Sequence, residues 1–150
     1  MYKAGVIGCR SIGVEHAIGI AGSDKAHLVA ACDLDQDMLD AFSAYFPHEE
    51  IVPYQNHREM IEKEQLDIVT VATSAPAHAD LVVDAAEGGA KGIFCEKPLA
   101  TNLADADRMV AACAANGTLL SVDHTRRFQP LWRHAKEQVV DQDVIGPIQY

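Results

Sequence analysis

Two glycines at a defined spacing mark the start of the chain, in the stretch GVIGCRSIGVEH at residues 5 to 16. The apolar run before Gly8 and the amphipathic segment after it predict a strand, a tight turn and a helix. In dinucleotide-binding proteins this arrangement holds a pyrophosphate, with Gly8 making the turn and Gly13 letting the helix pack closely on the strand. Arg10 occupies the position at which the G-x-G-x-x-G pattern has its second glycine.

Arg10 has three possible consequences for such a turn. Its side chain could push a pyrophosphate outward, or its guanidinium could fork onto the phosphate oxygens. Alternatively, it points into solvent and the pocket is degenerate. The amides of Ser11, Ile12 and Gly13 open the following helix and remain free for an anion. We therefore predict that the turn binds a dinucleotide, with the contribution of Arg10 left open.

An acidic residue lies at the position where a bound ribose would need a hydrogen-bond acceptor. Asp33 ends the second apolar run, twenty positions after Gly13, where a carboxylate can accept hydrogen bonds from the adenosine ribose hydroxyls. A carboxylate would also repel a 2′-phosphate, and Leu34 offers no cation to offset it, so NAD is favoured over NADP. The alternative is that Asp33 caps the next helix, which Asp35 could do equally well.

Around these residues the chain alternates between two kinds of segment. Five nearly continuous apolar runs indicate strands buried on both faces, as in a parallel sheet: KAGVIG, HLVAAC, DIVTVA, KGIFC and TLLSV. Between them lie four helical stripes of apolar residues: Val14, Ala17, Ile18 and Ala21; Met38, Ala41, Phe42 and Tyr45; Ala79, Val82, Val83 and Ala86; Ala106, Met109, Val110 and Cys113. Right-handed crossovers then give an α/β fold of the Rossmann type, a doubly wound parallel sheet with helices on both faces.

Local signals place several element boundaries. Asn56 followed by Glu59 resembles a capping box, and Gly117 is placed to end a helix. The run IVPY predicts a short edge strand, because proline is tolerated there. A further helix is expected from Phe128 to about Val144, with Trp132 between it and the sheet.

The chain of 150 residues is long enough for one domain with a real core. We expect residues 1–150 to form one dinucleotide-binding domain. The run IGPIQY at its end predicts a strand with no partner left in the chain. The chain is therefore interpreted as the first domain of a longer protein or a piece of one.

Composition excludes several classes of partner. The formal net charge is −10, which argues against binding nucleic acid or lying on anionic lipid, since both need a basic face. No apolar stretch approaches the roughly 20 residues that span a bilayer, and no basic segment precedes the first strand. Four scattered cysteines in apolar runs indicate buried reduced thiols and a cytoplasmic location: Cys9, Cys32, Cys95 and Cys113.

Metal binding is not expected from the histidine spacing. His27, His48, His57 and His134 show no ligand pattern such as H-E-x-x-H. The stretches VATSAPAHADLV, IFCEKPLAT and VDHTRRFQP follow three further strands, and in a doubly wound sheet all three lie at the carboxyl edge, where ligands bind.

With these stretches in place, the chain resembles the N-terminal domain of the glucose-fructose oxidoreductase, inositol dehydrogenase and rhizopine-catabolism (Gfo/Idh/MocA) family. The resemblance covers essentially the whole chain. It depends on an ordered set of residues: Gly8, Gly13 and His16; Thr73 and His78; Glu96, Lys97 and Pro98; Arg126, Arg127, Phe128 and Pro130.

The resemblance implies NAD(P)-dependent oxidation of a hydroxyl on a sugar, polyol or related compound. Lys97 would project between nicotinamide and substrate, where a lysine can take the hydroxyl proton or polarise the hydroxyl as hydride leaves. The likeness also implies a cis peptide bond between Lys97 and Pro98. The remaining residues expected at the cofactor are Thr73, Ser74, His78, Glu96, His124 and Arg126.

The resemblance further implies a second domain, absent from this chain, which supplies an acid/base pair in D-x-x-x-H spacing. The chain departs from the family pattern at Arg10, and at Ser74 and Ala75, where proline and asparagine are common. The alternative function is therefore a non-catalytic dinucleotide-binding or interaction module. Apolar surface left uncovered by the missing domain could also drive formation of a homo-oligomer.

Overall fold

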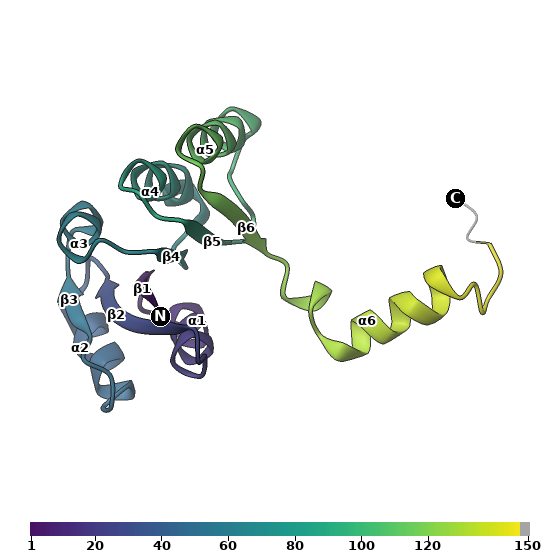
Figure 1. Cartoon of the computed structure of the whole chain (residues 1–150), viewed down its shortest axis with the longest axis horizontal. Helices are drawn as coiled ribbons and strands as arrows, with labels where there is room; N and C mark the ends of the chain where they lie inside the picture. The colour runs from purple at the N-terminus through teal and green to yellow at the C-terminus, as the bar shows by residue number, and fades with distance from the viewer. Residues whose placement is uncertain (148–150) are drawn as a thin grey trace.

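The computed structural model describes residues 1–147, which form a six-stranded parallel sheet and an arm that projects from it (Figure 1). The strand order is β3-β2-β1-β4-β5-β6. Successive strands are therefore added on one side of β1 as far as β3, and on its other side from β4 onward. This reversal between β1 and β4 is the point at which open α/β sheets bind ligands, at the carboxyl ends of the strands. The strands are β1 (Tyr2–Ile7), β2 (Ala26–Cys32), β3 (Val52–Tyr54), β4 (Ile68–Val71), β5 (Gly92–Glu96) and β6 (Leu119–Asp123).

Helices cover the two faces of the sheet unequally. Figure 1 shows α1 and α2 on one face and α3, α4 and α5 on the other. Val6, Ala17 and Phe42 belong to the core under the first pair, whereas Met60 and Met109 belong to the larger core under the other three. The helices are α1 (Ser11–Ala21), α2 (Gln36–Tyr45), α3 (His57–Glu64), α4 (Ala75–Glu87) and α5 (Leu103–Asn116).

The α/β fold, the six strands expected within residues 1–124 and the helix boundaries expected at Asn56 and Gly117 are confirmed. Asn56 caps α3, since its side chain accepts hydrogen bonds from two backbone amides, and Gly117 ends α5 with a φ of 67°. Pro53 lies in the edge strand β3, where a missing N–H is harmless. The apolar runs predicted these elements because burial on both faces leaves polar side chains little room.

The helix expected from Phe128 to about Val144 forms over a shorter range. A 3₁₀ turn (Thr125–Arg127) leads into α6 (Pro130–Lys136), which continues into a π-helical turn (Glu137–Asp141). This arm points away from the sheet in Figure 1, and Trp132 is 49 % exposed, so its expected packing against the sheet is wrong. Periodic apolar residues show that a helix forms but not which surface it meets.

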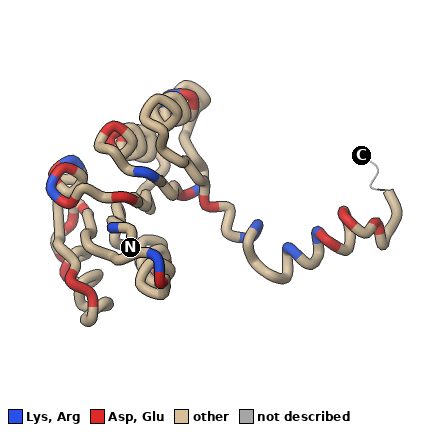
Figure 2. Tube along the Cα trace, in the orientation of Figure 1, with Lys and Arg blue, Asp and Glu red and all other residues tan. Residues whose placement is uncertain are grey.

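The strand expected at residues 145–150 falls partly on residues 148–150, which lie outside the described residues, and residues 145–147 are not in a strand. Figure 2 shows basic residues along the first part of the arm and acidic residues toward its far end. None of the helices in residues 1–147 combines the length and apolar character that a bilayer crossing requires.

Candidate functional site

The turn after β1 depends on both glycines. Gly8 has a φ of 96°, and a Cβ there would lie 2.5 Å from the carbonyl oxygen of Ala72. A Cβ on Gly13 would lie 1.8 Å from the carbonyl oxygen of Gly8. The first glycine therefore permits the left-handed turn beside β4, and the second permits α1 to begin directly against that turn. These are the two roles that the sequence assigned to them.

Arg10 sits at the N-cap of α1 with a φ of −82° and a ψ of −171°. This is ordinary extended backbone, so the position of the missing second glycine tolerates a side chain. Arg10 is exposed and lines the cavity described below. Within residues 1–147 its guanidinium has no hydrogen bond or ion pair, which leaves all of its donors available for an anion.

Asp33 joins the end of β2 to the glycine turn. One carboxylate oxygen accepts a hydrogen bond from the Cys9 amide at 2.8 Å, and the other accepts one from the Asp35 amide at 3.1 Å. Asp35, and not Asp33, caps α2 by accepting from the Asp37 amide. The carboxylate of Asp33 is therefore oriented by the backbone and keeps lone pairs for further donors.

A cavity of about 790 Å³ opens at the carboxyl edge, between the ends of β1, β2 and β4. Its volume is in the range of cofactor sites. Five residues predicted at the cofactor line it: Gly8, Arg10, Asp33, Thr73 and Ser74. Ser11, Ile12 and Gly13 follow Arg10 in the first turn of α1, so the free helix amides lie next to the cavity.

Part of this lining was not predicted from the sequence. Gln55 and His57 follow the edge strand β3, and Asp80 and Leu81 lie on α4. His57 is held by a 2.7 Å contact from Nε2 to a carboxylate oxygen of Asp84. The available signal was the position of residues 55–57 directly after a strand, since strand ends meet at one edge of a parallel sheet.

Asp84 carries a shifted pKa as a result of its partners. Burial raises the pKa of this carboxyl, but hydrogen bonds from His57 and Arg58 outweigh burial and lower it overall. The Arg58 Nε lies 2.9 Å from the same carboxylate. The rim of the cavity at His57 is thus fixed by a hydrogen bond to a carboxylate that also contacts Arg58.

The strand β5 delivers the Glu96-Lys97-Pro98 segment to the same edge of the sheet. The Lys97 side chain is exposed, its amide donates to Glu96 at 3.1 Å, and the Lys97–Pro98 peptide bond is cis, as the family resemblance implied. Glu96 is buried. Neither Glu96 nor Lys97 is among the residues that line the cavity.

His78 is fully buried and bridges two loops instead of lining the cavity. Its Nδ1 lies 3.0 Å from the carbonyl oxygen of Pro98, and its Nε2 lies 3.1 Å from that of Thr73. One carbonyl follows β5 and the other follows β4. His78 therefore fixes the two loops relative to each other.

His124 and Arg126 lie beyond β6, at the start of the arm, and do not line the cavity. Both are exposed. The guanidinium carbon of Arg126 lies 5.6 Å from the centre of the Trp132 ring, a cation–π distance. Of the predicted cofactor residues, the structure therefore does not place the later ones on the cavity: His78, Glu96, Lys97, His124 and Arg126.

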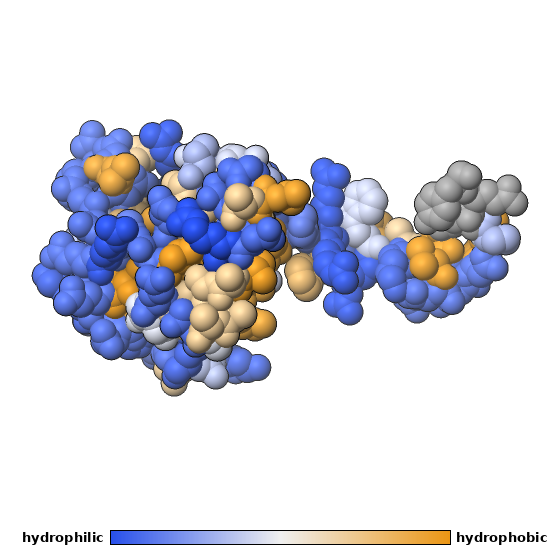
Figure 3. Space-filling view, turned by 90° about the horizontal axis from the view of Figure 1, so that it is seen from above, coloured by the Kyte–Doolittle hydropathy of each residue, from blue (hydrophilic) through white to orange (hydrophobic). Residues whose placement is uncertain are grey.

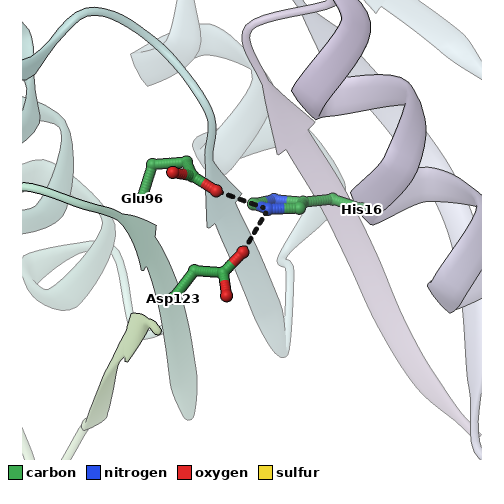
Figure 4. A group of neighbouring side chains, drawn as sticks. All are labelled: His16, Glu96 and Asp123. Carbon is green, nitrogen blue, oxygen red and sulfur yellow. Dashed lines mark ion pairs between the residues drawn. The ribbon is translucent and has the colours of Figure 1, made fainter. Parts of the chain in front are cut away.

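Two further residues at the carboxyl edge were not assigned from sequence. His16 projects from α1 toward Glu96 and Asp123, which end β5 and β6 (Figure 4). Its Nε2 lies 3.4 Å from Glu96 Oε1 and 3.5 Å from Asp123 Oδ2. His16 was noted only as part of a motif, and Asp123 carried no signal, because residues this far apart meet only in the fold.

The four cysteines are buried and free, as expected. Burial, reinforced by the charge of Asp33, raises the pKa of Cys9 and of Cys32 to about 12. Burial, with the neighbouring Glu96, raises that of Cys95 to about 12. These thiols are not nucleophiles at neutral pH, because the reactive form is the thiolate.

The site thus combines a glycine turn, a free helix N-terminus and an oriented carboxylate around one cavity at the reversal point of a doubly wound sheet. This defines a dinucleotide-binding domain of the Rossmann type. Residues 2–124 match the model of the oxidoreductase family described as having an NAD-binding Rossmann fold, and the chain belongs to this family, the Gfo/Idh/MocA oxidoreductases.

Named relatives agree with this assignment. The chain is 41% identical over 129 residues to D-apiose dehydrogenase of Paraburkholderia graminis, covering 86% of this chain and 34% of the relative. It is 36% identical over 144 residues to myo-inositol 2-dehydrogenase of Thermotoga maritima, covering 96% and 42%. The chain thus spans about a third to two fifths of the length of these relatives.

A solved structure gives the same result for the fold. The scyllo-inositol dehydrogenase of Lactobacillus casei with bound NAD(H) and scyllo-inositol superposes with a TM-score of 0.86 at 27% identity. The match covers 99% of this chain and 43% of that enzyme.

Proposed function

We propose that this chain holds NAD in the cavity at β1, β2 and β4, as the cofactor half of a dehydrogenase that oxidises a hydroxyl group of a sugar or polyol. The observation that carries the proposal is the hydrogen bond between the Asp33 carboxylate and the Cys9 amide. It fixes an acceptor for ribose hydroxyls beside the turn that would hold the pyrophosphate. The named activities of the relatives support the class of substrate.

Each part of the cavity has a role in this proposal. The amides of Ser11, Ile12 and Gly13 bind the pyrophosphate at the positive end of the α1 dipole, and the free guanidinium of Arg10 adds a cation. Thr73 and Ser74, which follow β4, also line the cavity. Bound NAD supplies the hydride acceptor, and the protein supplies orientation.

Lys97 is the residue we propose for catalysis on this chain. It follows β5 at the carboxyl edge with an exposed side chain, so its amine is free to meet a substrate. It either takes the hydroxyl proton or, as a cation, polarises the hydroxyl as hydride leaves. A second domain with an acid/base pair would complete the pocket, in keeping with the greater length of the relatives.

We also propose that NAD is preferred over NADP. Asp33 and Asp35 both line the cavity at the end of β2, and Leu34 between them is 87 % exposed. Two carboxylates would repel a 2′-phosphate there, and Arg10 is the only lysine or arginine among the residues that line the cavity of the described chain. The four buried thiols further support a reducing compartment such as the cytoplasm.

Calorimetric titration with NADH and NADPH tests the proposal on this chain. We expect NADH to bind with one site and NADPH to bind at least about 10-fold more weakly. Replacing Asp33 by alanine should weaken NADH binding by about 10- to 100-fold, since a hydrogen bond to a charged group contributes about 1.5–3 kcal/mol. Asp24→Ala is the matched control, because Asp24 is exposed and lies outside the cavity.

Two results would contradict the proposal. No binding of NADH at millimolar concentration would favour the alternative, a module without a working cofactor site. Equal loss of affinity in the Asp33 and Asp24 variants would show that the acid at the end of β2 does not hold the ribose. Circular dichroism of both variants separates loss of binding from loss of fold.

A further inference from the structure

A buried group of ionisable side chains lies outside the cofactor cavity. His16 comes from α1, Glu96 ends β5 and Asp123 ends β6 (Figure 4). Their side chains are only 6%, 11% and 11% exposed. None of the three lines the cavity proposed for NAD. The group is therefore a separate feature of the carboxyl edge.

The two carboxylates of this group lack a lysine or arginine partner. Glu96 accepts a hydrogen bond from the Lys97 amide at 3.1 Å, and Asp123 accepts one from the Thr125 hydroxyl at 3.0 Å. In the described part of the chain, no lysine or arginine lies within ion-pair distance of either. Buried charges are stable only when paired or bound to a metal. The pair of carboxylates thus requires a positive charge.

His16 does not supply that charge by ordinary hydrogen bonding. The Nε2 distances of 3.4 Å to Glu96 and 3.5 Å to Asp123 exceed the roughly 2.7–2.9 Å of charge-assisted hydrogen bonds. Among the described residues, neither nitrogen of this buried ring has a hydrogen-bond partner. A buried imidazole that is aimed at two carboxylates without a hydrogen bond to either is the arrangement expected where an ion binds all three side chains.

The two separations from His16 Nε2 match the edges of a metal coordination shell. Zinc bonds nitrogen and oxygen ligands at about 2.0–2.2 Å, so two ligands of a tetrahedral ion lie about 3.3–3.6 Å apart. Both distances from His16 Nε2 fall in this range, and all three ligand atoms lie within 4.8 Å of one another. One imidazole with two carboxylates is a donor set for borderline divalent cations.

We propose that His16, Glu96 and Asp123 bind a divalent first-row cation of the Zn²⁺ type. The ion neutralises the two carboxylates and ties α1 to the ends of β5 and β6. One coordination position remains open, since residues 1–147 supply three ligands. We expect micromolar affinity, because His16 Nδ1 has no acceptor in the described chain to orient the ring, and such outer partners contribute about 10- to 100-fold.

Titration of the chelator-treated chain with Co²⁺ and Zn²⁺ tests this site. We expect one Co²⁺ per chain, with visible absorption of a bound ion but no sulfur-to-metal band in the near ultraviolet. The absence of that band separates this site from binding by the cysteines. Zn²⁺ should displace the Co²⁺ and raise the melting temperature.

Matched variants identify the ligands. His16→Gln, Glu96→Gln and Asp123→Asn should each weaken Co²⁺ binding by at least about 10-fold. His27→Gln and Asp24→Asn change exposed residues of the same types and should leave it unchanged. In the unmodified chain, Zn²⁺ should shift the ring resonances of His16 and not those of His27, which requires no variant to fold.

Three results would overturn the assignment. The first is that no one-to-one complex forms, and the second is that a sulfur-to-metal band appears. The third is that Co²⁺ binding survives the Asp123→Asn and His16→Gln changes. An unshifted His16 ring in the presence of saturating Zn²⁺ would overturn it equally. Titration of the same sample with NADH reports on the cofactor cavity by itself, so failure of one proposal does not count against the other.

Discussion

At the scale of single residues, Arg10 is the residue that we expect to determine how well the glycine turn binds a phosphate. The sequence left open whether its side chain obstructs the pyrophosphate or binds it. The structure shows that the backbone at this position needs no glycine, and that the side chain is unpaired among the described residues and lines the cavity. These observations favour binding.

We therefore predict that Arg10→Ala weakens NADH binding by about 10-fold, the lower end of what a hydrogen bond to a charged group contributes. The variant should also show a weaker salt dependence, because one cation–phosphate contact is lost. Calorimetric titration at two salt concentrations measures both effects. Arg133→Ala on the exposed arm is the control. Unchanged or tighter binding by Arg10→Ala would instead show that the side chain obstructs the site.

The places of single residues at the site were predicted well where these residues belong to one local motif. Gly8, Gly13 and Asp33 stand at fixed offsets along one strand-turn-helix-strand unit, and the structure places Gly8 and Asp33 on the cavity and Gly13 beneath the turn. His16 and Asp123 could not be grouped in advance, because their approach depends on how α1 and β6 pack around β5.

At the scale of elements, the contact between α1 and the turn after β1 is the tightest backbone approach at the site. Gly13 allows it, because a Cβ there would meet the carbonyl oxygen of Gly8 at 1.8 Å. The same helix contains Gly19, at which an added Cβ meets nothing within 4 Å. Substitution of Gly13 therefore tests close packing against the turn, whereas substitution of Gly19 tests helix propensity alone.

We predict that Gly13→Ala lowers the free energy of unfolding by about 3 kcal/mol, because the clash is with backbone and cannot be relieved by a side-chain rotation. Gly19→Ala should raise it by about 0.5–1 kcal/mol, the cost of glycine in a helix. Urea denaturation of both variants provides the comparison. Equal effects at the two positions would contradict the close approach of α1 to the turn.

The sequence predicted the type of each element wherever a strand was buried on both faces or a helix had a capping residue. For the arm it predicted a helix, but not the surface that the helix contacts. Its apolar residues predicted a helix, and α6 forms, but Leu131 is 75 % exposed and Trp132 is 49 % exposed. Helical spacing shows that a helix has an apolar face, but which surface that face packs against depends on the rest of the fold.

At the scale of the whole molecule, apolar side chains are exposed near the β6 end of the sheet and along the arm. Figure 3 shows orange side chains on the side of the body that faces the arm. Leu119 on β6 is 73 % exposed, and Leu131 on α6 is 75 % exposed. Exposed apolar residues gathered in this way are typical of surfaces that meet another domain or chain.

Self-association of this chain remains a prediction, and we place it on these residues. Light scattering at several concentrations should show a mass that rises above that of the 16.2 kDa monomer. Leu131→Glu should reduce the association, because it puts a charge on the exposed apolar face. Leu34→Glu, at a leucine that is 87 % exposed and lies away from the arm, is the control. A monomer at every concentration would contradict the prediction.

By itself, the sequence determined the layered α/β fold, the glycine turn and the acid at the end of β2, because each depends on burial pattern or spacing within one short unit. Only the tertiary structure decided which side chains share the cavity, that His78 bridges two loops, and that His16, Glu96 and Asp123 meet. These contacts join residues from separate elements. Their distances follow from sheet order and helix packing, which no local pattern encodes.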